Sequence, residues 1–258
     1  MDLGIAGKTA LVCASSQGLG LACAQMLARE GATVILNGRN ADRLDAAAAS
    51  LRAFGAKVEM VVADQTTRDG RAAILNAAGE IDILVNNNAG PPPGGLSDWD
   101  EEALVAAMQA NMIPAVQFMR AVIPGMRARR FGRIVNITSA MVKSPHYVMG
   151  LSTSARAGLT AISKAISHEV AADNVTINNL LPERIDTPRQ AFMAQRIMDE
   201  QGVSRDEARR QIAETIAAKR FGLPDELAAA CAFLCSAYAG FISGQNLQVD
   251  GGSYAGLV

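Results

Sequence analysis

The sequence has few of the residues that bind metals, form disulfide frameworks or attract polyanions. It contains only four cysteines and two histidines, and no two cysteines form a C-x2-C pair. A zinc site built from these residues is therefore not expected. The 24 lysines and arginines are balanced by 25 aspartates and glutamates, a formal net charge of −1. A chain with so little net charge has no overall electrostatic field that attracts nucleic acid. We therefore expect neither a bound metal nor a nucleic-acid partner.

Long apolar runs and aromatic residues are scarce as well. No apolar run approaches the roughly 20 residues of a membrane span, and residues 1–4 lack the pattern of a signal peptide. These absences predict a cytoplasmic protein that does not contact membranes. Aromatic residues make up 4% of the chain, yet hydrophobic residues make up 50%. A chain near this length buries about three quarters of its unfolded surface, so a large core is expected.

Short apolar runs alternate along the chain with segments of helical spacing. The pattern predicts strands at 9–13, 33–36, 58–62, 81–85, 133–137, 175–180 and 246–249. Between them it predicts helices at 19–29, 43–52, 71–78, 99–126 and 152–172, a polar helical pair at 189–218, and a last helix opened by Pro224. Strand–helix alternation is typical of a parallel sheet with helices on both faces. We predict a single α/β domain over residues 1–258, a doubly wound Rossmann-type sheet, with a substrate lid at 188–219.

The turn after the first predicted strand is rich in small residues. It reads Ala14-Ser15-Ser16-Gln17-Gly18-Leu19-Gly20. Glycine lets backbone amides approach a pyrophosphate, and the following helix N-terminus adds partial positive charge. The widespread G-x-G-x-x-G spacing is absent. The turn instead resembles the T-G-x-x-x-G-x-G loop of the short-chain dehydrogenase/reductase family, with Ala14 in the place of the first glycine.

Further motifs carry this resemblance across residues 7 to 253. They are Asp64, Asn87-Asn88-Ala89-Gly90, Asn111, Ser139, the segment from Asn178 to Thr187, Arg220 to Pro224, and Ser243-Gly244 with Asp250-Gly251-Gly252. The resemblance implies that Asp64 contacts adenine, that the N-N-A-G motif lies along the cofactor, and that Asn111 and Ser139 belong to the active site. It also implies a homo-oligomer, a tetramer or a dimer.

The residues expected to hold the cofactor follow from the same motifs. They are Ala14, Ser15, Ser16, Gly18, Leu19, Gly20, Arg39, Asn40, Asp64, Gln65, Asn88, Ala89, Gly90, Arg156, Pro182, Ile185 and Thr187. NAD enzymes place an acid after the second strand, whereas an arginine accommodates the 2′-phosphate of NADP. Asn37 is not acidic, and Arg39 follows Gly18 by about 20 residues. We therefore expect NADP(H), with Ser15 and Asn40 as helpers. NAD(H) is the alternative cofactor. For Arg39, the alternative is that it is an ordinary solvated side chain on the surface with no part in cofactor binding.

The resemblance breaks at the residues that the family uses for proton transfer. Its Y-x-x-x-K motif lies about 13 residues after the serine, and Ser152 and Arg156 occupy those two positions here. A serine hydroxyl is a far weaker acid than a phenol, whose pKa is about 10, so Ser152 is a poor general acid. Arg156 can hold ribose hydroxyls but stays protonated and cannot relay a proton.

Two residues in the loop after Ser139 are candidate replacements for the tyrosine. His146 carries an imidazole, a common proton donor in enzymes, and Tyr147 carries a phenol. An ordinary loop or subunit-contact role is the alternative for both. The candidate catalytic residues are therefore Ser139, Ser152, Arg156, Asn111, Tyr147 and His146.

These features predict an NADP(H)-dependent oxidoreductase that transfers hydride to a small-molecule carbonyl substrate, a ketone or 3-oxoacyl-like compound. The proton donor would be His146, Tyr147 or water. Two alternatives stay open on the sequence. One is the same fold diverted to dehydration, isomerisation or imine reduction, and the other is a non-catalytic nucleotide-binding protein.

Overall fold

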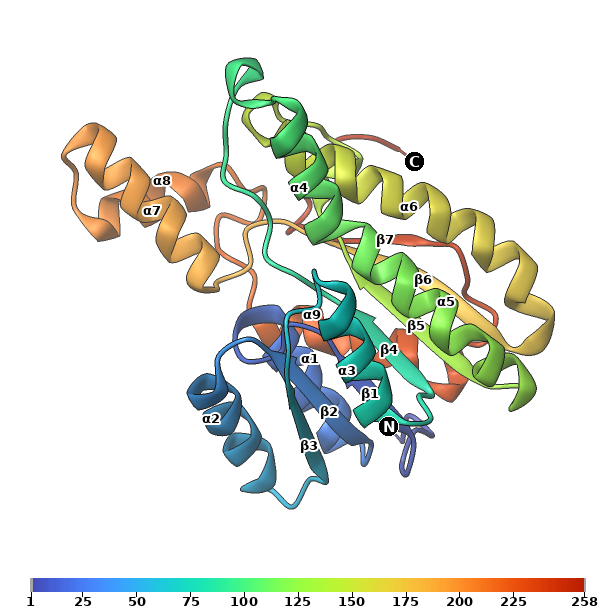
Figure 1. The fold of residues 1–258 in the computed structure, drawn as a ribbon. Helices are drawn as coiled ribbons and strands as arrows, with labels where there is room; N and C mark the ends of the chain where they lie inside the picture. The colour runs from blue at the N-terminus through green and yellow to red at the C-terminus, as the bar shows by residue number, and fades with distance from the viewer. Residues whose placement is uncertain (1, 258) are drawn as a thin grey trace.

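In the computed structural model, which describes residues 2–257, seven strands form one parallel sheet in the order β3-β2-β1-β4-β5-β6-β7 (Figure 1). The predicted single-domain, doubly wound α/β fold is thus confirmed. The order reverses between β1 and β4, and ligands of such sheets bind outside the carboxyl ends of the strands at this switch point. The strands are β1 (Thr9–Val12), β2 (Thr33–Gly38), β3 (Val58–Val62), β4 (Ile83–Asn86), β5 (Gly132–Ile137), β6 (Val175–Pro182) and β7 (Asn246–Val249).

Helices cover both faces of the sheet. Successive strand residues point to opposite faces, so Val12 and Leu36 pack into one apolar cluster while Leu11 and Ile35 pack into the other. Small side chains fill the space between helices and sheet, which explains why so few aromatic residues suffice. The first cluster is covered by α1 (Gly18–Arg29), α2 (Ala41–Arg52) and α9 (Pro224–Cys235), and the second by α3 (Arg68–Ala78), α5 (Ile113–Ala128) and α6 (Gly150–Val170) (Figure 1).

The single long helix predicted at 99–126 is wrong. The segment forms α4 (Glu101–Asn111) and α5, separated at Met112, whose φ of −127° is not helical. Pro114 has no N–H to donate to the carbonyl four residues earlier. The Asn88 side chain replaces that donor, because its Nδ2 donates to Ala110 O at 2.7 Å. The break therefore fixes the end of α4, and with it Asn111, beside the carboxyl end of β4.

Two further helices project beyond the carboxyl ends of the strands (Figure 1). They are α7 (Pro188–Gln201) and α8 (Arg205–Glu214). Ala194, Ala208 and Ile212 form a small apolar cluster between them. The pair occupies most of the predicted lid segment 188–219, and its role as a lid stays a prediction. No helix in the described part of the chain is long and apolar enough to cross a membrane.

Candidate cofactor and active site

The small-residue turn after β1 leads directly into α1. Gly18 has a φ of +60°, and a Cβ on Gly20 would collide with the carbonyl oxygen of Ala14, so both positions require glycine. Ala14 itself adopts a φ of +46°, a conformation that the family's glycine adopts without strain. Gln17 precedes the helix without a side-chain cap, and the first turn holds no acidic residue. The backbone N–H groups of this turn therefore fit an anion such as a cofactor diphosphate.

Ser15 and Asn37 are engaged inside the protein. Ser15 is fully buried, its hydroxyl donates to Val12 O at 2.8 Å, and its N–H donates to Asn37 O at 2.8 Å. Asn37 Nδ2 donates to Val61 O at 3.1 Å and to Ala63 O at 3.0 Å. Both donors of Ser15 are therefore used inside the protein, the N–H to join the turn after β1 to β2, and the Asn37 side chain joins β2 to the end of β3.

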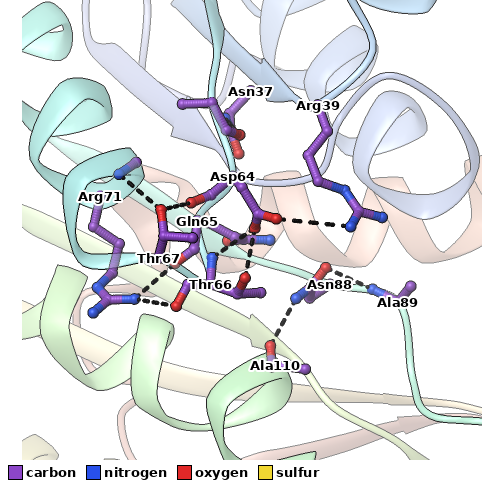
Figure 2. A network of polar contacts seen from close by, with 12 residues as sticks. Asn37, Arg39, Asp64, Gln65, Thr66, Thr67, Arg71, Asn88, Ala89 and Ala110 are labelled. Atoms are coloured by element: carbon purple, nitrogen blue, oxygen red, sulfur yellow. Dashed lines mark hydrogen bonds and ion pairs between the residues drawn. The ribbon is translucent and has the colours of Figure 1, made fainter. Parts of the chain in front are cut away.

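Arg39 and Asp64 form the polar group at the expected adenosine end (Figure 2). The Arg39 guanidinium is exposed and lies 3.8 Å from the Asp64 carboxylate. Partial burial alone would raise the pKa of Asp64, but hydrogen bonds from Thr66 N–H and Oγ1 and the charge of Arg39 outweigh it and lower the pKa. Asn40 caps α2, since its Oδ1 accepts from Arg43 N–H at 2.8 Å.

The segment after β4 is tied to the turn after β1. Gln65 Nε2 donates to Asn87 O at 2.9 Å, and Asn87 Nδ2 donates to Ala14 O at 3.2 Å. Asn88 Oδ1 accepts from the N–H of Ala89 at 2.9 Å (Figure 2). The N-N-A-G motif thus lies along the carboxyl end of the sheet, beside the turn that fits the diphosphate.

Arg156 is the centre of the polar contacts at the ends of β4 and β5. Its Nη1 donates to Ile137 O and Thr138 O, both at 2.8 Å, its Nη2 donates to Asn88 O at 3.2 Å, and its Nε donates to Ser152 Oγ at 3.2 Å. These contacts use four of the five donors of a guanidinium. Burial, and secondarily the positive charge of Arg189, lowers the pKa of Arg156 to about 10. Arg156 therefore stays protonated and binds chiefly to backbone, with one donor left for ribose or substrate.

The two candidate serines lie on either side of this guanidinium. Ser152 Oγ accepts from its Nε, whereas Ser139 directly follows Thr138, a backbone acceptor of Arg156, and its Oγ accepts from Met141 N–H at 3.2 Å. A Cβ built on Gly90 would lie 3.5 Å from Ser152 Oγ and 3.6 Å from Arg156 Nη2. Ser152 accepts from arginine, so its own O–H is free to donate. The N-N-A-G motif, Ser152 and Arg156 therefore meet at one place, and Ser139 follows the Thr138 carbonyl that Arg156 binds.

Asn111 lines a small cavity behind Arg156. The cavity has a volume of about 20 Å³, and a single water needs roughly 10–15 Å³ of such space. Both polar side-chain atoms of Asn111, and Oδ1 of Asn86, are buried without a partner among the described residues. Asn86 and Arg156 also line the cavity. The donor and acceptor set fits one hydrogen-bonded water between Asn111 and Arg156.

A ladder of asparagines runs across the sheet from this cavity, and the sequence analysis missed it. Asn86, Asn136, Asn179 and Asn246 are paired in register on β4 to β7. Each donates through Nδ2 to Oδ1 of the next, at 2.8, 3.0 and 2.8 Å. Asparagine is depleted in strands, so its occurrence inside three predicted strands and directly after a fourth was the available signal.

His146 and Tyr147 lie farther out, in the loop between β5 and α6. Both are exposed, Tyr147 to 68%. Tyr147 faces the loop before α4, where its ring centroid lies 6.1 Å from that of Trp99 and its Oη lies 2.8 Å from a Cβ built on Gly95. In the described part of the chain, no hydrogen bond joins either side chain to Ser152.

The segment after β6 completes the expected cofactor site. Pro182 ends β6, Ile185 pairs with Gly222, and Thr187 precedes α7. A Cβ on Gly18 would lie 3.9 Å from Thr187 Cβ, so this segment meets the turn after β1.

Comparison with known proteins agrees with this arrangement. A family model described as Enoyl-(Acyl carrier protein) reductase matches residues 13–254. The chain belongs to the short-chain dehydrogenase/reductase family. The NADPH-dependent reductase BacG of Bacillus subtilis, a relative from this family, is 32% identical over 252 residues, covering 95% of this chain and 97% of BacG. The 3-oxoacyl-[acyl-carrier-protein] reductase FabG of Aquifex aeolicus is also 32% identical, covering 98% of this chain and all of FabG.

A solved structure from the family matches the whole chain. It is the L-sorbose reductase of Gluconobacter frateurii complexed with NADPH and L-sorbose, which is 35% identical and has a TM-score of 0.95, with 100% of each chain covered. The family membership suggested by the motifs is therefore confirmed, and the placing of Ser152 and Arg156 at the positions of the family's tyrosine and lysine stays a prediction.

Proposed function

We propose that the protein is an NADP(H)-dependent oxidoreductase that reduces a ketone or 3-oxoacyl-like carbonyl compound. The observation that carries this proposal is the meeting of Ser152 and Arg156 beside Gly90, with Ser139 directly after the Thr138 carbonyl that Arg156 binds, next to a turn whose N–H groups fit a diphosphate. The family relatives support the reaction and the cofactor, because BacG is named an NADPH-dependent reductase and the sorbose reductase was solved with NADPH.

Backbone N–H groups at Ser16, Gly18 and Leu19 would bind the diphosphate, as the N-terminus of α1 favours an anion. Arg39 is exposed, and among the described residues its guanidinium has a single ion-pair contact, at 3.8 Å with Asp64, so it is free to bind a 2′-phosphate. Asp64 would contact adenine. NADP(H) is therefore preferred over NAD(H).

The bound nicotinamide supplies the hydride. The hydroxyls of Ser139 and Ser152 donate to the carbonyl oxygen, which becomes negative as hydride arrives. Ser152 accepts from Arg156 Nε, which holds its remaining O–H toward the substrate. The buried positive charge of Arg156 also favours the developing oxyanion.

Proton delivery must differ from the family's usual route, because the phenol is missing. Ser152 is too weak an acid to lose its proton alone. We propose that Ser152 Oγ gives its proton to the product oxygen while it takes one from a water, and that bulk solvent returns a proton to the hydroxide left behind. The hydrogen-bonding groups of Asn111 and Arg156 around the small cavity are suited to hold such a water.

Serine variants test this proposal. S152A and S139A should each lower kcat for ketones and 3-oxo esters by about 100-fold, the loss typical of an oxyanion donor, while the Kd for NADPH stays near that of the unaltered protein. S154A is the matched control, because Ser154 lies two residues on in α6 and its hydroxyl donates to Leu151 O. Binding of NADPH without turnover of any ketone would contradict the proposal.

The homo-oligomer and the cytoplasmic location remain predictions.

A further inference from the structure

Two arginines beside the serines carry positive charge that no carboxylate balances. Neighbouring arginines are paired, Arg184 with Glu183, Arg196 with Glu200 and Arg209 with Asp186. By contrast, among residues 2–257 neither Arg156 nor Arg189 forms an ion pair; their described polar contacts are with backbone oxygens and, for Arg156, Ser152.

Arg189 lies close to the reacting groups although it belongs to α7. Its Nη2 donates to Pro91 O at 3.1 Å. Pro91 directly follows Gly90, the residue that faces both Ser152 and Arg156, and adjacent Cα atoms are only 3.8 Å apart. Its nearness also agrees with the lowered pKa of Arg156, to which the charge of Arg189 contributes after burial.

The Arg189 guanidinium is suited to bind a ligand. It is half-buried, and the hydrogen bond to Pro91 uses one of its five donors. The Phe192 ring lies 5.5 Å from its central carbon and limits how far the side chain can swing. Burial, and then the charge of Arg196, lowers the pKa of Arg189. A bound anion would relieve this unbalanced charge and accept two parallel hydrogen bonds from the planar fork.

We infer that the substrate is an oxo acid, whose carboxylate binds Arg189 while its carbonyl lies at Ser139 and Ser152. This inference rests on the proposed reduction and narrows its substrate class. An uncharged ketone would bring no counter-ion to Arg156 and Arg189, so that the cofactor diphosphate alone would balance their charge. The methyl ester of the same acid keeps the carbonyl but loses the charge, so an acid and its ester form a matched pair.

Binding to the NADP+-loaded enzyme tests the inference without turnover, because the oxidised cofactor has no hydride to transfer. The probes are pyruvate, acetoacetate and levulinate, each compared with its methyl ester by isothermal titration calorimetry. At least one acid should bind about 10- to 100-fold more tightly than its ester, as expected for charge-assisted hydrogen bonds. R189M should abolish this preference and R189K should keep part of it. R196M, which alters a paired arginine of the same helix, should keep all of it.

Several results would overturn the inference. They are equal binding of every acid and its ester, no measurable binding of any acid, or an acid preference that R189M leaves intact. If R189M weakens NADPH binding about tenfold while that preference persists, Arg189 holds the cofactor instead. If the acids bind through Arg189 but no probe is reduced with NADPH, the proposed reductase activity fails while the carboxylate site stands.

Discussion

Replacing Arg156 with methionine should destabilise the whole protein. The guanidinium donates to the backbone oxygens of Ile137, Thr138 and Asn88 and to Ser152 Oγ. Methionine fills similar space without any N–H, so three backbone oxygens lose a donor. At about 1 kcal/mol net for each lost hydrogen bond, the loss is about 3 kcal/mol. For a protein of this size that lowers Tm by about 6–12 °C.

Thermal unfolding followed by circular dichroism measures this change in Tm. R156K should lie between R156M and the unaltered protein, because lysine keeps the charge and three donors. R210M is the matched control: Arg210 is an exposed arginine paired with Glu207, and its loss should lower Tm far less. If R156M melts within about 2 °C of the unaltered protein, a change worth under about 1 kcal/mol, Arg156 does not join β4, β5 and α6 as described.

Three further predictions concern the cofactor, the proton and pH. R39A should raise the Kd for NADPH about 10- to 100-fold through loss of a phosphate contact and leave NADH nearly unaffected; equal losses in titrations would refute the 2′-phosphate assignment. H146A and Y147F should keep kcat within about twofold of the unaltered protein, because proton transfer through water needs neither side chain. A large loss of kcat in one of these variants would identify the replaced residue as the proton donor. The hydrogen bond from Arg220, and to a smaller extent that from the N–H of Leu223, lowers the pKa of Glu226 to about 2. The unaltered protein should therefore be more stable than E226Q by its full margin above pH 4.5, and this margin should disappear as pH falls through about 2. An advantage that persists in acid unfolding curves below pH 2 would contradict the last prediction.

The sequence was sufficient for the sheet and for most of the helices. Short apolar runs and the glycines at 18 and 20 gave local signals that the tertiary structure did not override. The break between α4 and α5 was hidden, because apolar spacing continues through Met112. Pro114 alone marked it, and its effect depends on Asn88, 26 residues earlier, taking over the freed carbonyl of Ala110.

The candidate site was predictable in its parts but not in its contacts. That Ser152 and Arg156 occupy the positions of the family's tyrosine and lysine was predicted from the sequence alone. That Arg156 binds three backbone oxygens, one at the end of β5 and two in the segments after β4 and β5, is visible only once β4, β5 and α6 are packed together. Ser15 was expected near the phosphate, but both its donors bind inside the protein. Hydrogen bonds between residues far apart in the chain have no local signature.

Hydride transfer from labelled cofactor tests the central claim most directly. The protein is incubated with NADPH deuterated at C4, in each of the two stereochemical forms, and with ketones and oxo acids. Mass spectrometry of the alcohol should find deuterium on the carbinol carbon with one of the two forms, and S152A should form this product about 100-fold more slowly. NADPH bound in a one-to-one ratio, with no deuterated alcohol from any of these substrates, would contradict a carbonyl reductase built on Ser139, Ser152 and Arg156.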